Sequence, residues 1–336
     1  MTNALRVWLL SDGVPGHVNQ ARGLLYWMAK QRELDVEEVS VRLRAGTLSR
    51  QILTVWIERS MDPVRALKWA YAIDYPVEPP DLIVSAGGNT AFANVLLQRR
   101  FEVPNVFIGS GRRLSGKIFS AHLTLEPTGG STNVVMTLSP SNIDALAVAE
   151  AGRTWRQETI SSNRPLFCMA CGGNGAGVRY RVRDWTRLGI WMSRIASELD
   201  IRWLVSTSRR TTSTGESALR AAIADSALAY AIWWHQRPEP IFQTLLGAAD
   251  CNFVTHDSMS MINECISAEK PLVVVQGGRG GPDTRYTNVL NKFTQLGFCV
   301  RIQVDAGLEG VPEMSVPARD YHNALAEDVL RRLSIS

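Results

Sequence analysis

The sequence predicts an α/β protein built from two doubly wound parallel sheets, each forming a Rossmann-like domain. Short apolar runs alternate with amphipathic segments of helix length, as expected of successive strand–helix units. Most of the runs are continuously apolar, which is typical of parallel strands covered by helices on both faces. The alternation breaks once and restarts, and 336 residues exceed a typical single domain of roughly 100–200 residues.

The first half of the chain contains six predicted strands. The strand over 36–43 alternates apolar and polar side chains, so it is expected to be half-buried and near a sheet edge. Helices are expected to begin near Val18, Leu48, Pro63 and Thr90. The six strands are expected at residues 5–10, 36–43, 82–85, 105–108, 122–125 and 134–137.

The domain boundary is predicted between residues 139 and 165. We interpret Ser139-Pro140-Ser141 as a helix start, followed by a helix over 145–155 and a polar linker over 161–165. An N-terminal domain is therefore predicted over 1–150 and a C-terminal domain over 160–318. The last helix, within 319–336, has no strand after it and is a candidate for crossing back to the N-terminal domain.

The second half repeats the pattern. Because ligands of such sheets bind at the carboxyl ends of the strands, the loops that follow the strands are expected to contain the functional residues. Strands are expected at residues 166–170, 203–206, 231–234, 252–255, 272–276 and 300–303. Helices are expected at residues 182–198, 215–224, 240–249, 258–268, 285–296 and 320–333.

Composition excludes several classes of protein. Apolar residues make up 45% and charged residues 20% of the chain, which argues against disorder. The arginines are scattered, so no nucleic-acid partner is expected, and a pI near 8.9 suits anionic ligands or an anionic membrane surface. No apolar run approaches the ~18 residues that a membrane-spanning helix needs, so no such helix is expected. Five cysteines, an odd number without a signal peptide, favour a cytoplasmic, reducing location.

A glycine-rich turn follows the first strand. It contains Asp12, Gly13, Gly16 and His17 and opens the next helix. The glycines permit a sharp turn that leaves helix amide groups facing a ligand. A histidine at this place can accept a proton from an acceptor hydroxyl at neutral pH. The alternative is an ordinary glycine turn with a solvated histidine.

Two further glycine turns follow later strands. Gly88 and Asn89 come after the strand over 82–85 and are interpreted as lining a ligand cleft, the alternative being that they simply pack the helix against the strand. Gly173 and Asn174 come after the strand over 166–170, where glycines allow close approach of a diphosphate or of the other domain. The preceding Cys-x-x-Cys pair would suit zinc or redox chemistry, but no second such pair exists, so no metal is expected.

Hydroxyl and guanidinium groups follow the strand over 203–206. Ser206, Ser208 and Arg209 lie in the loop Ser-Thr-Ser-Arg-Arg-Thr. An arginine here can hold a diphosphate in bidentate fashion, with the hydroxyls adding hydrogen bonds. A solvated basic loop is the alternative.

The segment over 255–265 is the most informative. Asp257 or Ser258 is expected to cap the next helix, whose free N–H groups can receive phosphate oxygens. Glu264 lies one turn after Ser260 on the same helix face, and its carboxylate can accept both hydroxyls of a ribose. The alternative is a capped helix with an exposed glutamate.

Three of these segments together resemble the mitochondrial-fission ELM family. They are Ser11-Asp12-Gly13, the loop over 206–211 and the segment over 255–264. Bacterial members of that family are described as predicted nucleoside-diphosphate-sugar enzymes. The layout is similar, more distantly, to the glucosaminyltransferases that complete the peptidoglycan lipid precursor, whose GT-B fold places two Rossmann-like domains across a cleft.

The second resemblance implies roles for individual residues. The acceptor would lie against the N-terminal domain near His17, and the ribose of the donor would lie at Glu264. Ser258 and Ser260 would lie near the diphosphate. The glycine loop between the domains would correspond to Gly173 and Asn174.

The loop over 276–283 is interpreted either as a mobile sugar-gripping loop or as plain surface. Where the glucosaminyltransferases have a glutamine pair before an asparagine matching Asn288, this chain has Thr284 and Arg285. The donor sugar can therefore differ, and an acidic sugar is conceivable.

These observations lead to the hypothesis of an inverting, metal-independent glycosyltransferase. A nucleoside-diphosphate sugar is its substrate, and no cofactor is expected. His17 or Asp12 would activate the acceptor hydroxyl. A sugar-nucleotide epimerase is one alternative, although Asp12, His256 and Asp283 form no clear catalytic cluster in the sequence. A non-catalytic interaction protein in membrane division, suggested by the plant branch of the family, is the other.

The acceptor is not specified by any motif. Apolar and basic residues over 48–69 would suit contact with a membrane, which suggests a lipid-linked acceptor and a peripheral position on the inner face of the cytoplasmic membrane. The alternative, which such patterns more often form, is an amphipathic helix pair packed on the sheet.

Overall fold

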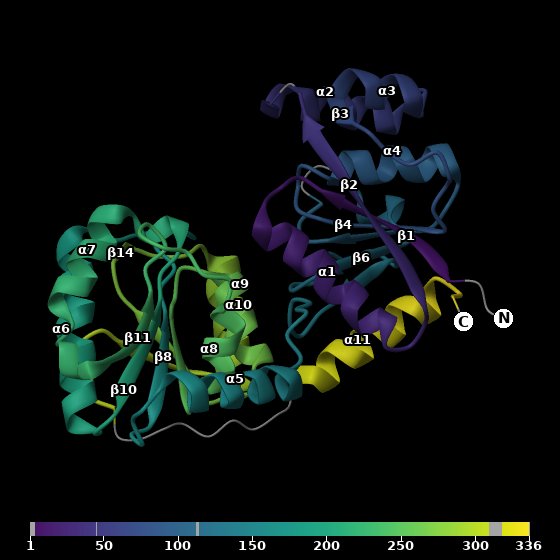
Figure 1. Ribbon diagram of the computed structural model, residues 1–336. Helices are drawn as coiled ribbons and strands as arrows, with labels where there is room; N and C mark the ends of the chain where they lie inside the picture. Colours follow the sequence, from purple (N-terminus) through teal and green to yellow (C-terminus); the bar gives the residue numbers. More distant parts are fainter. Residues whose placement is uncertain (1–3, 45, 112–113, 309–317, 336) are drawn as a thin grey trace. The chain divides into compact units, whose positions relative to one another are not determined.

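Residues 4–44, 46–111, 114–308 and 318–335 are described by the computed structural model (Figure 1). The chain divides into a first unit, Met1–Asn142 with Asp320–Ser336, and a second unit, Ile143–Arg319. Each unit contains one main sheet covered by helices, so the predicted class of two doubly wound sheets is correct.

The first unit has a seven-stranded sheet in the order β3-β2-β1-β4-β5-β6-β7. All neighbours run parallel except the edge strand β3, which is antiparallel to β2. Its strands are β1 (Leu5–Ser11), β2 (Leu34–Leu43), β3 (Tyr71–Ile73), β4 (Leu82–Ala86), β5 (Asn105–Ile108), β6 (Ala121–Thr124) and β7 (Asn133–Val135).

The continuous apolar run of β1 is explained by burial on both faces. Val7 and Leu9 pack into one core cluster with helices α1 (Pro15–Ala29) and α11 (Ala318–Arg332). Trp8 and Leu10 pack into a second cluster on the opposite face. That cluster includes α2 (Gly46–Glu58), α3 (Pro63–Ala70) and α4 (Ala91–Phe101).

The second unit has a six-stranded sheet in the order β11-β10-β8-β12-β13-β15, with all neighbours parallel. Its main strands are β8 (Leu166–Ala170), β10 (Arg202–Ser206), β11 (Leu228–Ile232), β12 (Cys251–Thr255), β13 (Leu272–Gln276) and β15 (Val300–Gln303). Two short strands, β9 (Val178–Arg179) and β14 (Arg279–Gly280), form a separate antiparallel ladder.

Helices cover both faces of the second sheet. Figure 1 shows α6 and α7 on one face, and α8, α9 and α10 on the other. The helices are α5 (Ala145–Thr159), α6 (Val182–Glu198), α7 (Ser213–Ala222), α8 (Phe242–Ala248), α9 (Met259–Ser267) and α10 (Thr284–Gln295).

The expected helix start at Ser139-Pro140-Ser141 is wrong. Ser141 is buried, and its carbonyl accepts a hydrogen bond from Trp27 Nε1 at 2.7 Å. Helix α5 begins only at Ala145, because the Asp144 carboxylate accepts hydrogen bonds from the first-turn amides and acts as the N-cap.

Helix α5 belongs to the second unit, so residue 150, the expected end of the first domain, lies inside it. Glycines allow it to pack on α8 at very short range. A Cβ on Gly152 would overlap the backbone of Gly247 and Ala248, and one on Gly247 would overlap Val148. From Asp320 onward, α11 packs within the first unit. No helix of the described residues is long and apolar enough to span a bilayer.

Candidate functional site

Four loops meet at the carboxyl edge of the second sheet, since its strands are all parallel. They follow β8, β10, β12 and β13. The N–H of Gly172, after β8, donates to Thr255 Oγ1 at 2.8 Å. The N–H of Gly173 donates to Asp257 Oδ2 at 2.9 Å. The loop after β8 is thereby tied to the end of β12.

Two glycines make this close approach possible. A Cβ on Gly172 would overlap the Asp257 carboxylate. Gly173 has a φ of +141°, and a Cβ there would overlap the Arg210 carbonyl. Any other residue would push the loops after β8, β10 and β12 apart.

Asp257 is the buried centre of these loops. Its side chain has no exposed surface, and Arg210 lies 3.2 Å from Oδ2. Burial raises the pKa of Asp257 from 3.8 to about 6. Because its carboxylate bonds the loop after β8, Asp257 does not cap α9, and of the two residues predicted for the cap it is Ser258 that occupies the N-cap position. The ion pair between Arg210 and Asp257 was not predicted from the sequence, because spacing alone does not indicate which of the two adjacent arginines, Arg209 or Arg210, points into the protein.

Helix α9 begins without a side-chain cap. Ser258 is its N-cap residue and makes no capping hydrogen bond. The hydroxyls of Ser258 and Ser260 are 3.3 Å apart. Ser260 and Glu264 are both partly exposed, one turn apart, whereas Ile262 is buried on the core side. An uncapped helix start next to two hydroxyls can receive an anion, and the carboxylate beyond it can accept a diol.

Of the predicted residues after β10, one is exposed to solvent and two form hydrogen bonds within the protein. Arg209 is exposed. Ser206 is buried, and its carbonyl accepts a hydrogen bond from the Cys171 N–H. Ser208 Oγ donates to the Gly172 carbonyl and accepts from the Arg210 N–H. The Ser208 hydroxyl therefore holds the loops together in this structure, and Arg209 is the group that faces solvent.

A buried carboxylate that the sequence did not single out supports the neighbouring loop. Glu216 of α7 is buried, and its Oε2 accepts a hydrogen bond from Thr207 Oγ1 at 2.6 Å. The same oxygen accepts from the His235 N–H at 3.1 Å. The link fixes the loop after β11 to the loop after β10. A glutamate at the start of a predicted helix gave no signal for this role.

The loop after β13 is anchored through aromatic side chains. Tyr286 OH donates to the His256 carbonyl at 2.7 Å, and burial lowers the pKa of His256.

Two further predicted residues lie in other segments of this edge. In the loop after β8, Asn174 Oδ1 accepts a hydrogen bond from the Tyr180 N–H at 2.8 Å, and the Asn174 side chain is exposed. Arg285 is exposed in the first turn of α10.

The first unit has its own polar cluster at the carboxyl ends of β1 and β4. The Asp12 side chain is 3% exposed and lies 3.0 Å from His17 Nδ1, whereas the His17 side chain is 36% exposed. Asn89 Nδ2 donates to Asp12 Oδ2 at 3.0 Å, and Arg50 donates to Asn89 Oδ1. With Nδ1–H directed to the carboxylate, Nε2 of the imidazole is the nitrogen that can accept a proton.

Glycines position the imidazole. Gly87 has a φ of +85°, and a Cβ there would overlap the His17 ring. Gly88 is the next residue of the same turn. Gly13, with a φ of +73°, shapes the turn before α1, and Gly16 lies in the first turn of α1. The structure thus brings Asp12, His17 and Asn89 together.

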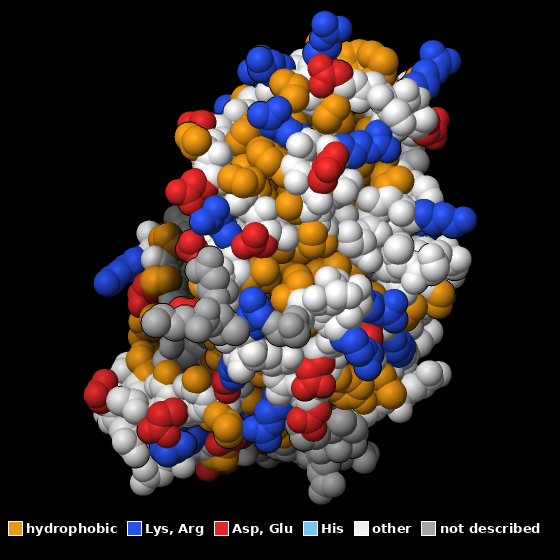
Figure 2. Space-filling view, turned by 90° about the vertical axis from the view of Figure 1, so that its right-hand side faces the viewer, with side chains coloured by type: hydrophobic (Ala, Val, Ile, Leu, Met, Phe, Trp, Pro, Cys, Tyr) orange, Lys and Arg blue, Asp and Glu red, His pale blue; other side chains and the backbone are white. Residues whose placement is uncertain are grey.

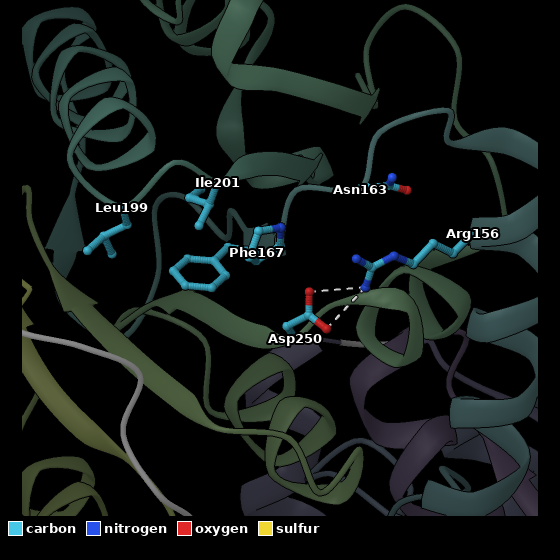
Figure 3. Close-up of a pocket in the computed structure, with 7 residues that line it drawn as sticks. Arg156, Asn163, Phe167, Leu199, Ile201 and Asp250 are labelled. Atoms are coloured by element: carbon cyan, nitrogen blue, oxygen red, sulfur yellow. Dashed lines mark hydrogen bonds and ion pairs between the residues drawn. The ribbon is translucent and has the colours of Figure 1, made fainter.

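A different cavity opens at the amino edge of the second sheet (Figure 3). Its volume is about 580 Å³, and its floor includes Phe167 and Ile201. Arg156 Nη1 binds both carboxylate oxygens of Asp250, at 3.1 and 3.0 Å. Asp250 also accepts from the Leu166 N–H at 2.8 Å. The charges in this cavity are neutralised by each other, and it contains none of the predicted site residues.

The described residues contain no group of three or more His, Cys, Asp or Glu side chains that could hold a metal ion. Cys168 and Cys171 are buried free thiols. Burial raises the pKa of Cys168 to about 12, so this thiol is protonated at neutral pH.

A family model described as mitochondrial fission ELM1 matches residues 15–333. No curated protein matches the chain by sequence. Among solved structures, the chain is similar to the UDP-GlcNAc 2-epimerase from Methanocaldococcus jannaschii, with a TM-score of 0.56 and 12% identity. That alignment covers 98% of this chain and 100% of the other.

Two further structures are similar over comparable lengths. The same epimerase in complex with UDP-GlcNAc and UDP gives a TM-score of 0.51 at 11% identity, covering 98% of this chain and 100% of the other. The ADP-heptose lipopolysaccharide heptosyltransferase II from E. coli gives 0.50 at 12% identity, covering 98% and 99%. These similarities confirm the predicted GT-B fold.

Proposed function

The chain belongs to the mitochondrial fission ELM1 family, and on that premise we propose that it transfers a sugar from a nucleoside-diphosphate sugar to an acceptor. The observation that supports this most is the arrangement of polar groups at the carboxyl edge of the second sheet. There the uncapped start of α9 lies beside Ser258 and Ser260, with Glu264 one turn further and Arg209 exposed nearby in the loop after β10.

In this proposal the diphosphate is bound at the start of α9. Free N–H groups and the positive end of the helix dipole favour phosphate oxygens there. The Ser258 and Ser260 hydroxyls add hydrogen bonds, and Arg209 supplies a positive charge. These groups stabilise the departing diphosphate without a metal ion or a cofactor. The two ribose hydroxyls donate to the Glu264 carboxylate.

The proton transfer is assigned to His17. As the acceptor oxygen bonds to the anomeric carbon, its proton passes to His17 Nε2, and the bond from that carbon to the phosphate oxygen breaks. The nucleoside diphosphate leaves with the bonding electrons, and a single displacement inverts the anomeric centre. Asp12 acts as a positioning residue, because it orients Nδ1–H and stabilises the imidazolium that forms.

The similar structures are consistent with this substrate class. Two of them are named for UDP-GlcNAc and ADP-heptose, both sugar nucleotides. Since identity is only 11–12%, they support the fold that suits such substrates, whereas the loops of this chain support the binding of one.

A sugar-nucleotide epimerase is the second candidate. The observation that favours it is the Asp12–His17 pair, since a carboxylate and an imidazole 3.0 Å apart can move a proton on and off carbon. Incubating the chain with each nucleotide sugar in deuterated water separates the two. Epimerisation would place solvent deuterium on the sugar, and glycosyl transfer would not.

For the acceptor, we propose a lipid-linked molecule. Figure 2 shows apolar and basic side chains mixed at the top of the view, over α2 and α3. Val55, Met61 and Trp69 are each more than 40% exposed there, and Arg65 and Lys68 are exposed beside them. Apolar and basic groups on one surface suit an anionic lipid headgroup region. Co-sedimentation with vesicles of anionic phospholipid tests this, and no sedimentation above that with neutral vesicles would contradict it.

The main test is calorimetric titration with a panel of nucleoside-diphosphate sugars. Wild type is expected to bind at least one of them, and Glu264→Ala is expected to weaken that binding by about a hundredfold or more, because two hydrogen bonds to a charged group are lost. Glu198→Ala, which changes an exposed glutamate of α6, is the matched control and should bind as wild type does.

If no nucleotide sugar binds wild type, the proposal is wrong and a non-catalytic interaction protein becomes the better account. If Glu264→Ala binds as tightly as the control, the ribose assignment is wrong.

A further inference from the structure

Two arginines face each other across the short ladder that joins the loops after β8 and β13. Arg179 of β9 is directly opposite Arg279 of β14, and Val178 is opposite Gly280. Directly paired residues of an antiparallel ladder project from the same face, with Cβ atoms roughly 4.5–5.5 Å apart. The two guanidinium groups therefore leave the ladder together.

This face is turned to solvent. Val178, the neighbouring residue, is 1% exposed, so its face of the ladder points to the core. Successive side chains of a strand alternate, and Arg179 and Arg279 are both exposed. Within the described part of the chain, neither guanidinium has an ion pair or a hydrogen bond. By contrast, Arg187 of α6 pairs with Asp305.

Like charges directly opposite in a ladder destabilise it. The backbone nevertheless holds them there. Gly177 and Gly280 both have a φ of +80°, and a Cβ on Gly177 would overlap the Gly281 carbonyl. The two loops approach so closely because both are glycine-rich. The arginine pair is thus fixed by specific backbone geometry. The electrostatic repulsion between the two guanidinium groups destabilises this arrangement, and a bound anion would offset that repulsion.

The four loops carry more positive than negative charge. The loops after β8, β10, β12 and β13, with residues 171–181, 206–212, 255–258 and 276–285, contain six arginines and two aspartates. Asp257 is paired with Arg210, and Asp283 caps α10 by accepting from the Tyr286 N–H. Two exposed arginines, Arg209 and Arg285, add to the positive charge of this edge.

The ladder lies at the same carboxyl edge of the sheet as the proposed diphosphate site. In the sheet, β12 lies between β8 and β13, and the ladder connects the loops that follow those two outer strands. A ligand held at the start of α9, directly after β12, would therefore lie at the same edge of the sheet as the arginine pair. In the proposed function the diphosphate is bound by the α9 amides, Ser258, Ser260 and Arg209. Arg179 and Arg279 are therefore available to bind a second anionic group of the same ligand.

We propose that Arg179 and Arg279 bind an oxyanion on the sugar part of the donor, so that the donor is an acidic nucleoside-diphosphate sugar. Two adjacent guanidinium groups match the two oxygens of a carboxylate or the oxygens of a phosphate. The inference rests on the proposed function and narrows its substrate class.

The test compares donors that differ only in one carboxylate. UDP-glucuronate and UDP-glucose form one pair, and GDP-mannuronate and GDP-mannose form the other. Wild type is expected to bind the acid of at least one pair about tenfold or more tightly than its neutral partner. In the double variant Arg179→Gln/Arg279→Gln this ratio should fall to about one, while affinity for the neutral sugar stays unchanged. Arg183→Gln, at an exposed arginine of α6, is the matched control.

Three outcomes would overturn the inference while leaving the proposed function standing. The acid and neutral sugars could bind wild type equally, or the neutral sugar alone could bind. The double variant could also lose affinity for both to the same extent, which would mean that the pair binds the diphosphate. Binding of no nucleotide sugar at all would instead contradict the proposed function. Removing the repulsion should leave the unfolding temperature of the double variant equal to or above that of wild type, so failure to fold is not expected.

Discussion

The two sheets end in clusters of opposite chemistry. At the first sheet, a buried carboxylate, Asp12, is bonded to a half-exposed imidazole, His17. At the second sheet, the buried carboxylate of Asp257 is bonded to the Gly173 amide and paired with Arg210, and the neighbouring loops carry exposed arginines. The same structural position, the carboxyl ends of parallel strands, thus carries the proposed base in one unit and the proposed anion-binding surface in the other.

The largest effect is expected from removing the base. His17→Ala should lower kcat by roughly 10²- to 10⁴-fold, the usual contribution of general acid–base catalysis, with the affinity for nucleotide sugar unchanged. His235→Ala, at an exposed histidine of the second unit, is the control and should leave kcat as it is. Equal activities of the two variants would show that the first cluster is not a proton acceptor.

A smaller effect is expected from moving the base. Gly87→Ala places a methyl group on the His17 ring, and displacing a catalytic group by about 1 Å costs on the order of a hundredfold in rate. Gly129→Ala shares the positive φ, +76°, but its Cβ would meet no atom within 4 Å. The pair of variants therefore separates backbone strain from displacement. If both lose the same activity, strain alone accounts for the loss.

A pH dependence of stability is expected from the second cluster. Because the pKa of Asp257 is raised in the folded state, folding favours its protonated form, and stability falls as pH rises from about 4 to about 6. The rise in the pKa of Asp257 from 3.8 to about 6 corresponds to at most about 3 kcal/mol of unfolding free energy. Relative to Asp257→Asn, wild type should lose up to this much unfolding free energy over that range.

Urea unfolding of both proteins at pH 4, 5, 6 and 7 measures this difference. A wild type that instead gains stability relative to Asp257→Asn with rising pH would mean that Arg210 lowers the pKa of Asp257 by more than burial raises it.

Much of the fold was predictable, because it rests on burial. Continuous apolar runs indicated the parallel strands, and α6 has the predicted bounds, Val182–Glu198, owing to its strong apolar periodicity. The edge strand β3 was missed, since three residues give no periodic signal. Strand β11 was placed three residues late, because Trp233 and Trp234 suggested a strand where the chain already forms the next loop.

The residues of the site were harder to predict than its location. Strand–turn–helix patterns placed the loops correctly, and Asp12, His17 and Asn89 do lie together. Hydrogen-bond partners depend on three-dimensional packing, so the sequence could not show that Asp257 bonds the loop after β8 or that Arg210 turns inward. The opposed Arg179 and Arg279 were invisible for the same reason, since a register of two-residue strands leaves no pattern.

Hydrogen–deuterium exchange with a saturating nucleoside-diphosphate sugar tests whether the four loops of the second sheet bind the donor. We predict slower amide exchange in the loops over 171–181, 206–212, 255–264 and 276–285, and unchanged exchange around the cavity of Figure 3, over 156–167. Protection around that cavity, with none in the four loops, would contradict the account.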